Sequence, residues 1–80
     1  MPNLSKRRQD ATLVALGTAI KRIRLSHKIS QEKLALLSEI DRSYVGRIER
    51  GDNNAAILTL SKLAKALGIS LTELMHEAKL

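Results

Sequence analysis

The chain has 80 residues, which is enough for one compact domain and too few for a second domain with a separate catalytic or effector-sensing role. Aromatic residues make up only 1% of the sequence, and a composition rich in aliphatic residues favours helices over a β-sandwich or barrel. We therefore expect an all-α fold.

The charge of the chain points to a polyanionic partner. Fourteen Lys and Arg residues stand against eight Asp and Glu residues, which gives a formal net charge of +6. This charge alone fits nucleic acid and an anionic membrane equally well. The sequence has no cysteine, which excludes a disulfide framework and thiolate metal sites and suits the reducing cytoplasm in which we expect the protein to act.

Residues 1–9 are predicted to form a flexible basic tail that carries Lys6, Arg7 and Arg8. This triplet is either a solvated tail or an arm that enters the minor groove of DNA. The apolar run that follows loosely resembles a secretory signal, but Asp10 interrupts it and no small-residue cleavage site follows. No segment approaches the ~20 apolar residues that span a bilayer.

Residues 10–80 are predicted to form a single domain of short helices. The first helix covers residues 10–26, where apolar side chains recur at three- and four-residue steps. The second, over residues 30–38, begins at a serine that can cap it. The third, over residues 41–51, begins at an aspartate and ends at Gly51, which permits a left-handed cap.

Two further helices follow a polar loop at residues 52–54. The fourth has apolar positions from Ile57 to Leu67 and stops at Gly68. The fifth begins with a capping box formed by Ser70 and Glu73. Because isolated helices below ~12 to 15 residues are marginal in water, the five must fold by packing together.

The second and third helices, with the longer helix before them, have the proportions of a helix-turn-helix. From Leu16 to Leu74 the sequence resembles the Cro and phage-repressor (XRE) type of helix-turn-helix domain. The matching segments are SQEKLA at 30–35, IDRSYVGRIERG at 40–51 and TLSKLA at 59–64. Residues 41–44 and 48–51 are also similar to the controller proteins of restriction-modification genes. The resemblance implies a compact five-helix domain that binds DNA.

The third helix separates a core side from a DNA side. Positions 42, 43, 46, 47 and 50 share one side, whereas positions 45 and 48 share the other. Arg42 and Arg47 can each offer a planar fork of donors to guanine in the major groove. Ser43 can contact a base edge or a phosphate, and Tyr44 a phosphate or a thymine methyl group. Gly46, which costs up to about 1 kcal/mol relative to Ala in a helix, is expected to let the backbone approach DNA closely.

Other residues are expected to contact phosphate or to stabilise the fold. Gln31 lies in the first turn of the second helix, where its side chain and the free amides suit an anion, and the resemblance implies the same contact. Arg50 and Asn54 form the second predicted phosphate contact. The resemblance also implies that Arg24 and Glu49 form an internal salt bridge between the first and third helices.

The sequence departs from the family pattern at both turns that flank the second helix. Lys28 and Glu39 stand where the family usually has glycine. Because a side chain at positive φ costs of order 1 kcal/mol, we expect the turn to adopt a somewhat different backbone shape. Ala55 and Ala56 replace the usual Pro-Ser before the fourth helix and remove its expected cap.

The last third of the chain has more apolar residues than one small core needs. We expect the surplus to form a self-complementary homodimer surface. The residues concerned are Leu58, Ile69, Leu71, Met75 and Leu80. A dimer would place two recognition helices about 34 Å apart, which suits an inverted repeat in double-stranded DNA.

The predicted function is a sequence-specific transcriptional regulator. The alternative is an antitoxin-type protein-binding partner that also regulates its own promoter, although no disordered toxin-wrapping tail is evident. Membrane binding is disfavoured because the core takes up each apolar helix face. His27 and His76 lie too far apart for a metal site, and no set of residues supports catalysis, so we expect no metal, no cofactor and no enzymatic activity.

Overall fold

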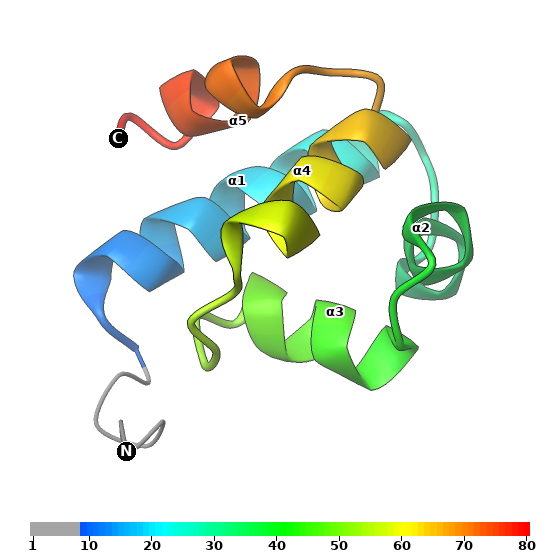
Figure 1. The fold of residues 1–80 in the computed structure, drawn as a ribbon, viewed down its shortest axis with the longest axis horizontal. Coiled ribbons are helices and arrows are strands. Elements are labelled where there is room, and N and C mark those ends of the chain that lie inside the picture. The colour runs from blue at the N-terminus through cyan, green and yellow to red at the C-terminus, as the bar shows by residue number, and fades with distance from the viewer. Residues whose placement is uncertain (1–8) are drawn as a thin grey trace.

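The computed structural model describes residues 9–80, so the predicted tail with Lys6, Arg7 and Arg8 lies outside the described residues. Within the described part the chain forms five helices and no strand, as the sequence predicts. They are α1 (Ala11–Ser26), α2 (Gln31–Ser38), α3 (Arg42–Glu49), α4 (Ile57–Ala66) and α5 (Leu71–Glu77) (Figure 1). Figure 1 places α3 on the side of the molecule opposite α5, with α1 and α4 between them.

Four helix starts are set by capping residues, three of which, Ser30, Asp41 and Ser70, were predicted from the sequence. The side chains of Asp10, Ser30, Asp41 and Ser70 each accept a backbone N–H from the first turn of the helix that follows. Ser70 and Glu73 form the predicted capping box. The helix α4 begins after Ala56 without any side-chain cap, as the sequence predicts, so its start depends on packing.

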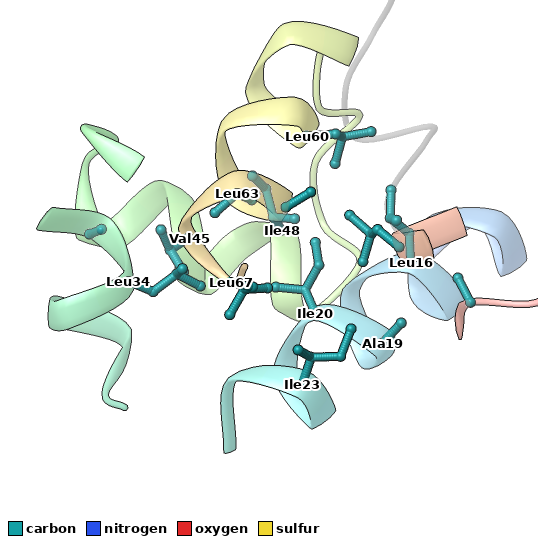
Figure 2. Close-up of a cluster of buried hydrophobic side chains, with 14 residues drawn as sticks. Leu16, Ala19, Ile20, Ile23, Leu34, Val45, Ile48, Leu60, Leu63 and Leu67 are labelled. Carbon is teal, nitrogen blue, oxygen red and sulfur yellow. The ribbon is translucent and has the colours of Figure 1, made fainter. Parts of the chain in front are cut away.

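The core joins all five helices through aliphatic side chains. Its largest fully buried members are Ile20, Leu34, Val45, Ile48, Leu63, Leu67 and Leu74 (Figure 2). The helix α1 packs against α3 and α5, while α2 packs against α3 and α4. Burial of these side chains supplies the stability that the short helices lack on their own.

The backbones of α1 and α3 approach each other closely at Gly17. A Cβ atom there would lie 2.7 Å from the carbonyl oxygen of Glu49 and closer still to that of Ile48. No side chain fits between these backbones. Gly17 therefore fixes the distance between the two helices.

The expectation of an altered backbone at the turns around α2 is wrong. Lys28 and Glu39 both adopt the left-handed conformation, each with a φ of 58°. At the end of α2 the amide of Glu39 donates to Leu36 (3.3 Å), and the amide of Ile40 donates to Ala35 (3.0 Å). These bonds satisfy the last carbonyls of the helix and offset the steric cost of a side chain at positive φ.

None of the helices in residues 9–80 is both long enough and apolar enough to cross a membrane.

Candidate nucleic-acid interface

The helix α3 carries basic side chains on one side and buried side chains on the other. Arg42, Ser43 and Arg47 are exposed. Val45 and Ile48 lie in the core, at 0% and 2% exposure. The predicted separation of faces is present at these positions, whereas Gly46, which was expected on the DNA side, is buried.

Arg47 is positioned by its neighbour on the same helix. Its guanidinium carbon lies 5.6 Å from the centroid of the Tyr44 ring, a cation–π geometry. Tyr44 itself is half-buried and packs against the core. The ring therefore gives the exposed arginine a fixed support.

The start of α3 is held by Asp41. Its carboxylate accepts the hydroxyl of Ser43 and, at 3.2 Å, the amide of Ser43. The hydrogen bond from the Ser43 hydroxyl is the largest cause of a pKa below the ordinary aspartate value, and backbone bonds and the charge of Arg47 act in the same direction. Ser43 is thus engaged in capping while its side chain stays exposed.

A buried ion pair joins α1 to α3. The Nε atom of Arg24 lies 2.7 Å from Glu49 Oε2, and one of its terminal nitrogens lies 3.1 Å from Glu49 Oε1. The two side chains are only 8% and 2% exposed. Arg24 also donates to the carbonyl of Ile29 at 2.9 Å. The pair has the position that the family resemblance implies.

Gln31 belongs to this buried network, which the sequence reading missed. Its Nε2 donates to Glu49 Oε1 at 2.9 Å, so the side chain that was expected to face a phosphate is turned toward α3. An amide nitrogen carries two hydrogens, and one of them satisfies Glu49. No local sequence signal links the two residues, because they are 18 positions apart.

Gly46 is covered by the side chains of two predicted phosphate-binding residues. A Cβ atom at this position would lie 3.3 Å from a terminal nitrogen of Arg50 and 3.7 Å from Gln31 Oε1. The missing side chain thus makes room for Arg50 and Gln31 over α3. This gives the glycine a role within the free protein, and the close approach of its backbone to DNA stays a prediction.

The loop after α3 holds the other predicted phosphate contacts. Arg50 is exposed, and its Nε lies 3.1 Å from Oδ2 of Asp52, whose side chain is only 13% exposed. Asn54 is exposed and lines a small hollow together with Asp10 and Thr12 at the start of α1. Arg50 and Asn54 therefore lie beside the point where the chain enters α1.

The residues predicted for a dimer surface divide into two groups. Leu58 and Leu80 are 73% and 53% exposed. Ile69, Leu71 and Met75 are half-buried and pack against the core of their own chain. Further exposed apolar side chains, which the sequence reading did not single out, are Leu25, Leu36, Leu37 and Ile57.

The short helix α3 has an exposed arginine face, is joined to the longer helix α1 by a buried ion pair and is followed by a polar loop. This arrangement is that of a helix-turn-helix DNA-binding protein. The helix-turn-helix family matches residues 20–74. The chain belongs to this family, of the Cro and phage-repressor (XRE) type, and is a DNA-binding transcription regulator.

Individual relatives are control proteins. The chain is 40% identical over 60 residues to the control protein C.BamHI of Bacillus amyloliquefaciens, covering 74% of each chain. It is 34% identical over 65 residues to C.MunI of a Mycoplasma species, covering 80% of this chain and 88% of the relative. The crystal structure of the restriction-modification controller protein C.AhdI from Aeromonas hydrophila is similar with a TM-score of 0.76 and 47% identity, over 78% of this chain and 94% of that chain. These relatives are regulators and not enzymes.

Proposed function

We propose that this protein binds an inverted-repeat operator as a homodimer and that each copy reads one half-site through α3 in the major groove. The observation that carries the proposal is the exposed face of α3, where Arg42 and Arg47 project beside Ser43 while the opposite side is buried. Paired guanidinium donors match the O6 and N7 acceptors of guanine. The likeness to controller proteins favours restriction-modification genes as the regulated targets.

The phosphate contacts surround this face. Gln31 donates to Glu49 with one of its amide hydrogens, which leaves the other for a phosphate oxygen. The Arg50 side chain is 61% exposed and can exchange its bond to Asp52 for a phosphate, and Asn54 lies nearby in the same loop. These contacts fix the orientation of α3 and leave the choice of sequence to its arginines.

A second copy of the chain is the proposed partner at the apolar surface that includes Leu58 and Leu80. Both side chains are largely exposed, and α5 lies across the molecule from α3, so an interface that uses the end of α5 leaves α3 free. Ile69, Leu71 and Met75 would support that surface from the core side. We expect sedimentation at tens of micromolar to give a dimer and a Leu58→Ser/Leu80→Ser variant to be monomeric. A wild-type monomer at that concentration would contradict the homodimer.

Selection of bound sequences from a random duplex pool tests the readout. The expected product is an inverted repeat whose half-site centres lie about 10 base pairs apart. Each good bidentate contact contributes about 1–3 kcal/mol of base discrimination, so Arg47→Ala should relax preference at one position of each half-site. Lys62→Ala/Lys65→Ala, on the exposed side of α4, is the matched control and should keep the wild-type preference. Unchanged operator preference in an Arg42→Ala/Arg47→Ala variant would refute the proposal.

A further inference from the structure

The side chains of Gln31 and Arg50 come from different elements and meet over Gly46 on α3. A Cβ atom at Gly46 would lie 3.3 Å from a terminal nitrogen of Arg50, 3.7 Å from Gln31 Oε1 and 3.8 Å from Gln31 Nε2. Gly46 is buried, although the next residue, Arg47, is exposed. The amide and the guanidinium therefore lie side by side at the point where α3 lacks a side chain.

Glu49 fixes the orientation of the Gln31 amide. Gln31 Nε2 donates to Glu49 Oε1 at 2.9 Å, which leaves the second hydrogen of the same nitrogen for another acceptor. Glu49 is only 2% exposed, and its charge is neutralised by the ion pair with Arg24. The carboxylate can thus direct the amide without repelling an anion that binds beside it.

Asp52 holds the Arg50 side chain in a similar way. Its Oδ2 accepts from Arg50 Nε at 3.1 Å, and its Oδ1 accepts from Gln9 Nε2 at 2.6 Å. The bond to Asp52 uses only Nε, so the terminal nitrogens of Arg50 keep hydrogens that can be donated to an anion even before that bond is exchanged. The Arg50 side chain is 61% exposed, and an anion can reach it from solvent.

We propose that Gln31 and Arg50 bind one and the same phosphate of the DNA backbone, at a site built over Gly46. This inference rests on the proposed docking of α3. A phosphate oxygen accepts from amide and guanidinium donors alike, and hydrogen bonds to an ionised acceptor are the stronger kind. The sequence groups Arg50 with Asn54, whereas the structure places its guanidinium beside Gln31. Asn54 lines a hollow at the start of α1.

Neutralising single phosphates tests whether the two residues share one. Each phosphate of the operator duplex is replaced in turn by an uncharged methylphosphonate, and the affinities of wild type, Gln31→Ala and Arg50→Ala are measured. At the shared phosphate, wild type should lose about 10-fold or more and each variant about 3-fold or less, because the variant has already lost part of that contact. Asn54→Ala is the matched control and should be as sensitive there as wild type. Any scan in which the two variants do not lose sensitivity at the same phosphate overturns the proposal.

A double-mutant cycle applies the same test to any duplex, including a scrambled sequence. Gln31→Ala and Arg50→Ala should each weaken binding by about 10-fold, and the double variant by only about 10- to 20-fold, because loss of either donor loosens the phosphate for the other. Gln31→Ala/Asn54→Ala should instead weaken binding by the product of its two single effects. Thermal melts without DNA establish that each variant is folded at the assay temperature. A cost of about 100-fold for Gln31→Ala/Arg50→Ala, the product of two independent contacts, overturns the proposal.

The outcome is separable from that of the proposed function. Arg42→Ala/Arg47→Ala should lose preference for operator over scrambled duplex, whereas Gln31→Ala/Arg50→Ala should keep it. Retained preference in the former refutes the readout, whatever the phosphate scan shows. Two different phosphates for Gln31 and Arg50 refute only the present inference, because each residue would still contact the DNA backbone.

Discussion

The buried pair of Arg24 and Glu49 allows a quantitative prediction about stability. Replacing Arg24 by Met removes the charge and keeps a long side chain, so Glu49, at 2% exposure, retains only the hydrogen bond from Gln31. Breaking a buried pair in this way costs about 3–5 kcal/mol, because the remaining charge is uncompensated. A domain of this length has a total stability of only about 4–12 kcal/mol. Arg24→Met should therefore lose a quarter or more of it.

Thermal unfolding followed by circular dichroism measures the effect. For a domain of this size each kcal/mol corresponds to about 4–8 °C, so the melting temperature should fall by at least about 12 °C. Because a variant this unstable can be largely unfolded, Arg24→Met/Glu49→Leu provides the complement. With both charges gone, it should recover most of the wild-type stability. A single variant that melts within about 3 °C of wild type would refute the reasoning, as would a double variant no more stable than Arg24→Met.

Three other substitutions test how α3 packs against its neighbours and how its N-terminus is capped. Gly17→Ala places a methyl group against the carbonyls of α3 and should lower the free energy of unfolding by about 1–3 kcal/mol, measured by urea titration. In Gly46→Ala the new methyl group lies 3.3 Å from the end of the flexible Arg50 side chain, which has to shift slightly, so the helix propensity of alanine should still raise stability by about 0.5–1 kcal/mol. Weaker DNA binding by the same variant would support a close approach of backbone to DNA. Asp41→Ala should lower the melting temperature at neutral pH. Because the pKa of Asp41 is lowered in the folded protein, the stability that its carboxylate contributes is present above the ordinary aspartate pKa and is lost as the pH falls through the lowered value. The difference from wild type should thus close in strongly acidic solution, and a gap that persists there would contradict this account.

The helices could be predicted from local sequence because their ends are set by local chemistry. Ser30, Asp41 and Ser70 cap within three residues of themselves, and Gly51 adopts a positive φ at the end of α3. Glu39 was predicted less well, since the penalty of its left-handed backbone is readable from sequence whereas the hydrogen bonds that offset it appear only in the folded turn.

The parts of the site that sequence reasoning missed depend on contacts between distant residues. Gln31 meets Glu49 across 18 positions, and Gln9 meets Arg50 across 41, with no periodicity or capping pattern to reveal either bond. The apolar residues of the last third could not be divided from sequence for a related reason, because α5 packs close enough for Leu71 to be half-buried against the core whereas Leu58 stays exposed. Composition gives the amount of apolar surface but not how the last helix covers it.

The close approach at Gly17 has a consequence for how new operator preferences can arise. At Gly17 the two helices meet through peptide groups, so this contact imposes no requirement on which side chains occupy positions 42, 43 and 47. Given the proposed readout, these positions can be exchanged for those of another regulator while the depth of the helix in the groove stays constant. Under the proposed readout, base preference can therefore diverge while the contact of α3 with α1 at Gly17 stays the same.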